Sequence, residues 1–160
     1  MSTKFFNNRL GNTLFDKLKG IASGMVTFDR FLAVVGFFRS SGYFKLRKEL
    51  GDISEIKILV GINIDDIFRK HNKALLMLAD EVKAKEIYNN DFKEDIVNAQ
   101  YSPEVEEGIL QMCEDLVSGR LQMRIHATKN LHAKFYLCLP QNHSENSDGW
   151  VIMGSSNISD

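Results

Sequence analysis

A histidine and a lysine two residues apart, His132 and Lys134, are the residues of this sequence best suited to chemistry on a phosphate. They lie in the stretch from Leu131 to Leu139, whose alternating pattern predicts a β-strand, and side chains two apart on a strand point to the same face. An imidazole and an ammonium would then stand side by side. The imidazole can act as a nucleophile or base, and the ammonium is a fixed positive charge for phosphoryl oxygens.

A second group of polar residues follows the next predicted strand. The run from Trp150 to Met153 is apolar and ends abruptly in Gly154-Ser155-Ser156-Asn157, a turn of small hydrogen-bonding residues. If this strand pairs with the preceding one as a hairpin, the turn comes close to His132 and Lys134. A nucleophile, a cation and several neutral donors in one place predict a site for a phosphate diester.

Two buried strands and a helix are predicted upstream of these residues. The continuous apolar runs Phe31 to Phe38 and Ile56 to Ile62 are rich in β-branched and aromatic residues, which is typical of central strands. Between them, Ser40 or Ser41 can cap a helix that continues to Leu50. The order strand, helix, strand predicts a βαβ unit with parallel strands and a right-handed crossover.

Further helices are expected over 12–21 and, almost throughout, over 65–118, where Ser102 is placed as an N-cap before Pro103. Residues 121–127 alternate strictly and lead through a turn into the 131–139 strand. Arg124 and His126 are therefore expected to neighbour His132 and Lys134, or else to form a solvated edge face. These elements predict an α/β fold, a mixed sheet flanked by helices on both faces.

Composition indicates one globular domain over residues 1–160, because 44% of the residues are hydrophobic and no linker or repeat interrupts the pattern. The net charge of -1 gives no global basic signature. Residues 80–115 hold eleven acidic and three basic residues, whereas the rest of the chain holds 17 basic and 10 acidic residues. A polyanion should therefore avoid the middle of the chain and prefer its ends.

Cellular location is indicated by the cysteines and by the apolar runs. Cys113 and Cys138 have no spacing typical of a zinc site or a disulfide framework, so a reduced, cytoplasmic protein is expected. The N-terminus is too polar for a secretory signal, and no apolar run approaches the ~20 residues that a membrane span requires. The sequence therefore predicts no membrane partner and no metal.

The pattern His132-x-Lys134 followed by Gly154-Ser155-x-Asn157 resembles the H-x-K…G-S-x-N signature of the phospholipase D superfamily. The runs at 31–38 and 56–62 are also similar to the N-terminal phospholipase D-like domains of helicases and of metal-independent restriction nucleases. The resemblance covers most of the chain. It implies a phospholipase D-like mixed sheet and hydrolysis of phosphodiesters without a cofactor.

Specific roles follow from this resemblance. It implies that His132 attacks phosphorus to form a covalent phosphohistidine, and that Lys134 and Asn157 hold the non-bridging oxygens. The phosphate-binding turn would consist of Gly154, Ser155 and Ser156. One motif per chain implies a homodimer in which a second His132 protonates the leaving oxygen. The implied partners are nucleic acid, foremost DNA, and a helicase module C-terminal to this chain.

Two departures from the signature leave an alternative open. Leu139 stands where the signature has an aspartate, and the segment between Lys134 and Gly154 is longer than in the strict pattern. A catalytically inactive module that binds phosphate or DNA and dimerises beside a helicase would show the same features, and a purely structural domain is a third reading. The end of the chain at Asp160, soon after the motif, predicts that this is the N-terminal part of a longer protein.

Overall fold

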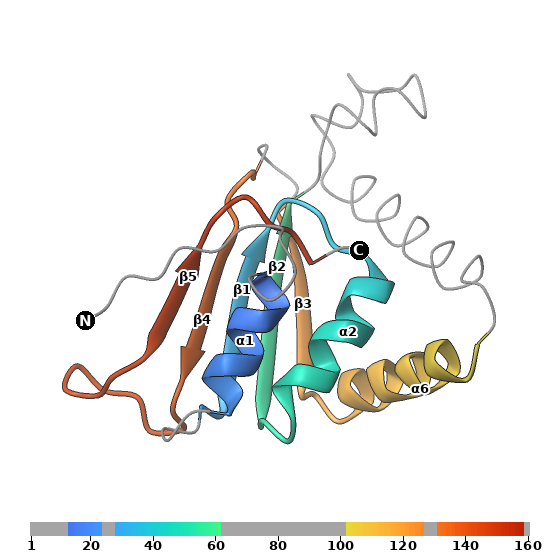
Figure 1. Cartoon of the computed structure of the whole chain (residues 1–160), viewed down its shortest axis with the longest axis horizontal. Coiled ribbons are helices and arrows are strands. Elements are labelled where there is room, and N and C mark those ends of the chain that lie inside the picture. Colours follow the sequence, from blue (N-terminus) through green and yellow to red (C-terminus); the bar gives the residue numbers. More distant parts are fainter. Residues whose placement is uncertain (1–12, 24–27, 62–101, 127–130, 159–160) are drawn as a thin grey trace.

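The computed structural model describes residues 13–23, 28–61, 102–126 and 131–158, and its centre is a five-stranded mixed sheet (Figure 1). In sheet order the strands are β3, β2, β1, β4 and β5. Their bounds are β1 Arg30–Val35, β2 Glu55–Gly61, β3 Leu121–His126, β4 Phe135–Leu139 and β5 Trp150–Met153. The mixed α/β fold expected from the sequence is confirmed.

The central strand β1 joins two halves of the sheet with different strand directions. It pairs in parallel with β2 through the βαβ unit that the sequence predicts, and β2 pairs in parallel with β3. On its other side β1 pairs antiparallel with β4, which forms the expected hairpin with β5. The predicted central position of the 31–38 strand and the predicted hairpin are therefore both confirmed.

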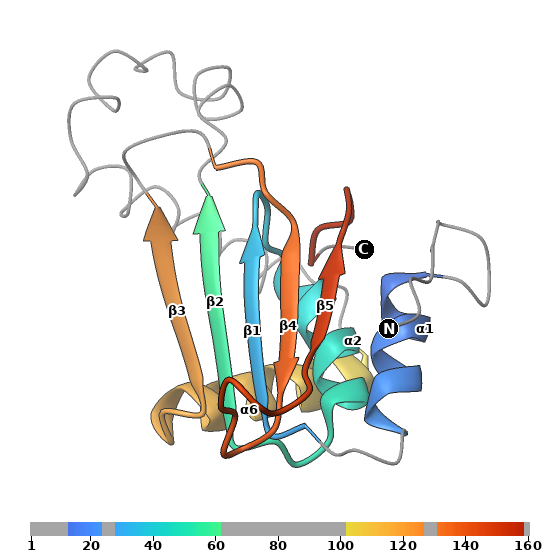
Figure 2. The same cartoon turned by 90° about the vertical axis from the view of Figure 1, so that its left-hand side faces the viewer.

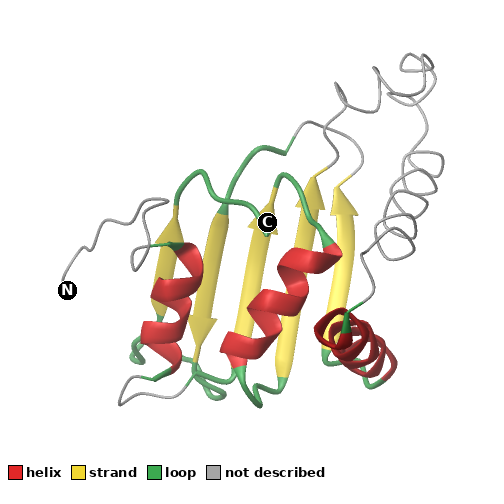
Figure 3. Cartoon of the chain, turned by 45° about the vertical axis from the view of Figure 1, so that its right-hand side comes forward, coloured by secondary structure: helices red, strands yellow, loops and turns green. Residues whose placement is uncertain are grey.

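Three described helices form a layer over one face of the sheet: α1 (Leu14–Ala22), α2 (Ser40–Leu50) and α6 (Pro103–Val117). Helices α1 and α2 lie in front of the sheet in Figures 1 and 3, and Figure 2 shows the bare face of the sheet with the helices behind it. Helices on both faces are thus not found among the described elements. Most of the helical region predicted at 65–118 falls on residues 62–101, outside the described residues.

The helix starts have different local causes. Helix α1 begins after Thr13, whose hydroxyl accepts from the Asp16 amide while Asp16 accepts from the Thr13 amide, a capping box. Hydrogen bonds from Thr13 also lower the pKa of the Asp16 carboxyl. Helix α6 begins as predicted, with Ser102 as N-cap and Pro103 in the first turn. Helix α2 differs from the prediction.

The N-cap of α2 is Arg39, which makes no side-chain capping bond. The prediction that Ser40 or Ser41 caps this helix is therefore wrong. The reason is that the helix begins earlier than expected: Arg39 is the last extended residue, and its amide donates to the Ile158 carbonyl at 2.9 Å. Both serines consequently lie inside the first turn of the helix.

The hydrophobic core lies between the sheet and this helical layer. Burial alternates strictly along β1 and β4 and over most of β2, as expected for strands with one covered face. The core side chains of β1, β2 and β4 are Phe31, Ala33, Val35, Ile56, Ile58, Val60, Tyr136 and Cys138. Helix α2 contributes Tyr43, Phe44, Leu46 and Leu50. The alternation predicted for residues 131–139 thus separates a buried face from a half-covered one.

A buried polar cluster ties α2 to α6. The Asp115 carboxylate accepts hydrogen bonds from the Tyr43 hydroxyl and from the Arg47 Nε, both at 2.7 Å, and Arg120 lies 3.4 Å away. Burial, followed by the bond to Asp115, raises the pKa of the Tyr43 phenol. Because the carboxylate is neutralised and hydrogen-bonded, its burial is compatible with a stable fold.

Strand β3 occupies a different place from the one expected. It lies at the edge of the sheet beside β2, with Gly61 opposite His126, so β2 and β1 separate it from β4. The expectation that Arg124 and His126 neighbour His132 and Lys134 by strand pairing is therefore wrong. Because α6 enters β3 from the same end as α2 enters β2, β3 must run parallel to β2. No helix among the described residues is long and apolar enough to cross a membrane.

Candidate functional site

The two polar groups singled out in the sequence meet at the carboxyl end of β1. Val34 of β1 lies opposite Phe135 of β4, and Phe135 lies opposite Met153 of β5. The residues just before β4 and just after β5 therefore lie next to each other, beyond the end of the central strand. The Gly154 amide donates to the Lys134 carbonyl at 3.2 Å and closes this junction.

Lys134 is the most unusual residue of this junction. Its side chain belongs to the covered face of the sheet, and the residue is only 8% exposed. The ammonium donates to the His132 carbonyl at 2.9 Å and lies 2.7 Å from the His132 Nδ1. No described Asp or Glu forms an ion pair with it. The site therefore contains a largely buried positive charge that no described carboxylate neutralises.

His132 lies at the solvent side of the same junction. It is exposed, and it precedes the first residue of β4, because the strand predicted from Leu131 begins four residues later, at Phe135. Its Nδ1 faces the Lys134 ammonium. Since the two ring nitrogens lie on opposite sides of the imidazole, Nε2 is the nitrogen left for a ligand.

Asn157 is held by the backbone of the β1 extension. Its Oδ1 accepts a hydrogen bond from the Phe37 amide at 3.0 Å, and the next residue, Ile158, forms a parallel bridge with Phe38. Because the oxygen of the carboxamide is occupied, its NH2 group is the part free to donate to a ligand. The backbone thereby fixes which end of Asn157 can serve an anion.

Two glycines that the sequence analysis did not single out lie at this junction, and the packing requires one of them. A Cβ at Gly36 would lie 3.4 Å from the Lys134 Nζ and 3.5 Å from the Asn157 Oδ1. A Cβ at Gly61 would lie only 2.4 Å from the Leu131 carbonyl oxygen, which no side chain tolerates. Glycines at the ends of two buried strands were the available signal, because glycine there often marks the close approach of another segment.

The turn after β5 contains the three predicted phosphate-binding residues. Gly154 and Ser155 are exposed, and Ser156 is half-buried. The Ser156 carbonyl accepts a hydrogen bond from the Tyr136 hydroxyl, so the buried tyrosine anchors the turn from below. Burial raises the pKa of the Tyr136 phenol, which keeps it a donor. The turn can thus supply backbone and hydroxyl donors beside Asn157.

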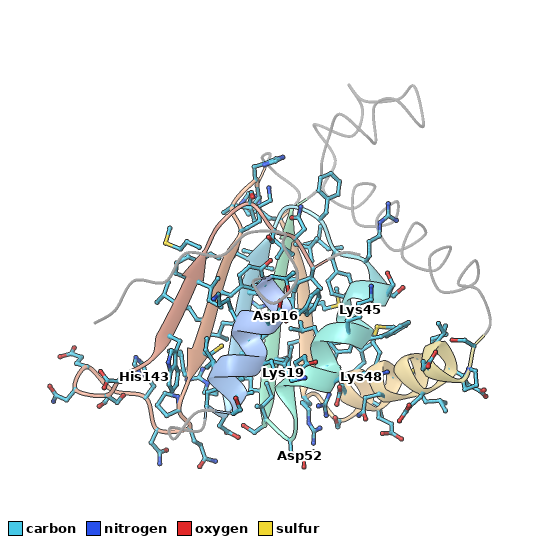
Figure 4. All side chains as sticks on the ribbon, viewed as in Figure 1. Asp16, Lys19, Lys45, Lys48, Asp52 and His143 are labelled. Atoms are coloured by element: carbon cyan, nitrogen blue, oxygen red, sulfur yellow. The ribbon has the colours of Figure 1, made fainter. Side chains whose placement is uncertain are left out.

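Four other residues belong to different parts of the sheet. Arg124 and His126 are on β3, two strands from β4. His143 is exposed in the β4–β5 loop, which Figure 4 shows at the opposite end of the sheet. Leu139, in the aspartate position of the signature, is half-buried at the far end of β4. His143 and Leu139 therefore lie outside the candidate site, whereas His126 lies opposite Gly61, which Leu131 approaches closely.

Comparison with protein-family models and with curated proteins gave no match. Within the described part of the chain, no group of three or more His, Cys, Asp or Glu side chains is placed to hold a metal ion. The functional interpretation therefore rests on four features of the junction: the buried ammonium, the imidazole beside it, the oriented carboxamide and the turn.

Proposed function

We propose that this chain is a phosphodiesterase module that hydrolyses nucleic-acid phosphodiester bonds. The observation that carries the proposal is the ammonium of Lys134, which is 8% exposed and has no described carboxylate partner. Burying an unpaired charge costs several kcal/mol, so such a charge is retained where an anionic ligand completes it. The imidazole of His132 at 2.7 Å and the tethered Asn157 make phosphate a fitting anion.

The reaction would proceed in two displacements. The Nε2 lone pair of His132 attacks phosphorus, the bond to the leaving oxygen breaks, and a second imidazole gives that oxygen a proton. Water then attacks the phosphohistidine and gives a proton to the second imidazole, and the P–N bond breaks to release a phosphate monoester and His132. Lys134 and Asn157 would stabilise the charge on the non-bridging oxygens in both steps.

The second imidazole would come from a second copy of the chain. A two-fold dimer that brings two copies of His132 together would supply it, as the single motif in each chain implies. The resemblance of the motif is also the ground for proposing nucleic acid, foremost DNA, as the substrate. It is likewise the ground for proposing a helicase module C-terminal to this chain.

Substitution of His132 tests catalysis directly. We expect His132→Ala to lower the cleavage of DNA in EDTA by at least about 100-fold, because it removes the atom that attacks phosphorus. His143→Ala is the matched control, since His143 is an exposed histidine at the far end of the sheet. Equal cleavage by the two variants would rule out the proposed mechanism. Sedimentation velocity on the same samples would check the dimer.

A second candidate, a binding module without turnover, is favoured by one specific observation. Leu139 occupies the position of the motif aspartate. This candidate predicts salt-dependent DNA binding that Lys134→Ala weakens, with no cleavage. Isolation of a covalent phosphate on His132 after a stopped reaction would exclude it in favour of the enzyme.

A further inference from the structure

The Lys134 side chain contacts His132 at two points. The Lys134 ammonium donates to the main-chain carbonyl of His132 at 2.9 Å, and the same nitrogen lies 2.7 Å from the ring Nδ1. The two contacts form a closed ring between residues two apart. They fix the orientation of the imidazole as well as its position, even though His132 itself is exposed.

The chemistry of the two groups decides the direction of the ring contact. A lysine ammonium has three N–H donors and no acceptor, so Nδ1 of His132 must accept. A neutral imidazole that accepts at one nitrogen carries its proton on the other. We therefore propose that Lys134 is a positioning residue that holds the proton of His132 on Nε2 in the resting site.

The close approach of β1 supports this assignment. The ammonium lies beside the end of this strand, 3.4 Å from where a Cβ of Gly36 would stand. Two of the three ammonium donors go to His132, and one remains. That donor and the Nε2–H of His132 can both reach an incoming phosphoryl oxygen, so the resting site is arranged to capture an anion.

The assigned tautomer depends only on the contacts between Lys134 and His132, whereas its role in catalysis rests on the proposed function. In the resting tautomer Nε2 has no lone pair, so the residue can bind an oxygen or donate a proton but cannot attack phosphorus. For attack, the ammonium must leave Nδ1 for a phosphoryl oxygen, and the ring proton must move to Nδ1. Lys134 would thus link phosphate binding to activation of the nucleophile.

Nitrogen NMR on the histidine-labelled chain tests the assignment. At a pH above the imidazole titration, the wild-type His132 should carry its proton on Nε2, with the Nδ1 resonance of a hydrogen-bond acceptor. In Lys134→Met, the ratio of Nε2–H to Nδ1–H forms should fall by about tenfold or more, which is the factor that a charge-assisted hydrogen bond supplies. The His132 signal is assigned by its loss in His132→Gln.

Two outcomes would overturn the inference. One is a proton on Nδ1 in the wild-type chain, a measurement that needs no variant to fold. The other is a tautomer ratio unchanged in Lys134→Met while the amide spectrum shows the native fold. Lys134→Arg should restore part of the ratio, because it keeps a donor. If the wild-type tautomer is Nε2–H but no cleavage occurs, the inference stands and the proposed enzyme activity fails.

Discussion

At the scale of single residues, function explains Lys134 better than stability does. A buried ammonium loses much of its hydration, and its two bonds to His132 offset only part of that cost. An apolar residue of similar length would fit the covered face of the sheet at lower cost. The charge is therefore best understood as part of an incomplete site that a phosphate would complete.

The resemblance to the H-x-K…G-S-x-N signature selected His132, Lys134 and Asn157 from the sequence, and the structure brings all three together. Their contacts could not be predicted. That the Asn157 oxygen would be occupied by the Phe37 amide depends on how the end of β1 meets the turn after β5, 120 positions later in the chain. Local sequence patterns do not show which distant segments of the chain contact each other.

Substitution of Asn157 by aspartate tests the orientation of its carboxamide. The new side chain keeps an oxygen for the Phe37 amide, but it replaces the NH2 donors with negative charge beside the anion site. We expect Asn157→Asp to weaken binding of labelled single-stranded DNA by at least about tenfold, with little loss of thermal stability. Fluorescence anisotropy at fixed salt measures the affinity.

The control for this change is Asn142→Asp, which adds the same charge in the exposed β4–β5 loop. It accounts for the effect of net charge on a polyanion. Similar affinities for the two variants would mean that the Asn157 NH2 donors do not contact the ligand.

At the scale of elements, the strands were predictable and one of their neighbours was not. Apolar runs and alternation located all five strands, and the βαβ unit and the hairpin followed from the order of the predicted elements. The position of β3 in the sheet could not be predicted, because an alternating pattern indicates a half-covered strand but not the strand with which it pairs. The crossover through α6 decides it, and β3 joins the β2 edge while β4 takes the free side of β1.

The contact between Gly61 and Leu131 is the element-scale feature most open to a test. The segment that leads to His132 crosses the end of β2 so closely that a Cβ at Gly61 would meet backbone at 2.4 Å. We expect Gly61→Ala to push this segment away, to destabilise the fold by about 1–3 kcal/mol and to lower DNA affinity as well. Urea unfolding and anisotropy measure the two effects.

The matched substitution is Gly20→Ala in α1, where no atom lies within 4 Å of the new Cβ. Because alanine is the better helix former, this variant should gain up to about 1 kcal/mol of stability and bind DNA unchanged. A Gly61→Ala variant as stable as wild type would show that the crossing is loose, and that the sequence before His132 is held by other contacts.

At the scale of the whole molecule, the described domain is a sheet with one covered face. The candidate site lies at the carboxyl end of the central strand β1. Helices α1, α2 and α6 bury one side of the strands. Side chains of the other side, such as Leu32, Leu59 and Leu137, are only half-buried. Sequence alone could not rank the two faces, because both are apolar in the central strands.

The two cysteines differ in burial because of this layered organisation. Cys138 is fully buried in β4, between Phe31 of β1 and Trp150 of β5, and burial raises its pKa to about 12. Cys113 is exposed on α6. Because thiols react as thiolates and need access, Cys113 should react with a thiol reagent at neutral pH without unfolding, whereas Cys138 should wait for the sheet to open.

Labelling kinetics in increasing urea measure that opening. For Cys138 we expect a rate that rises with the same urea dependence as global unfolding, since β4 is paired on both sides and cannot open by itself. Cys113→Ser should abolish the fast reaction and leave the slow one. Rapid labelling of Cys138 in native buffer would show that the β4–β5 hairpin detaches from β1. Such a hairpin could not hold Lys134 and Asn157 in place for a phosphate.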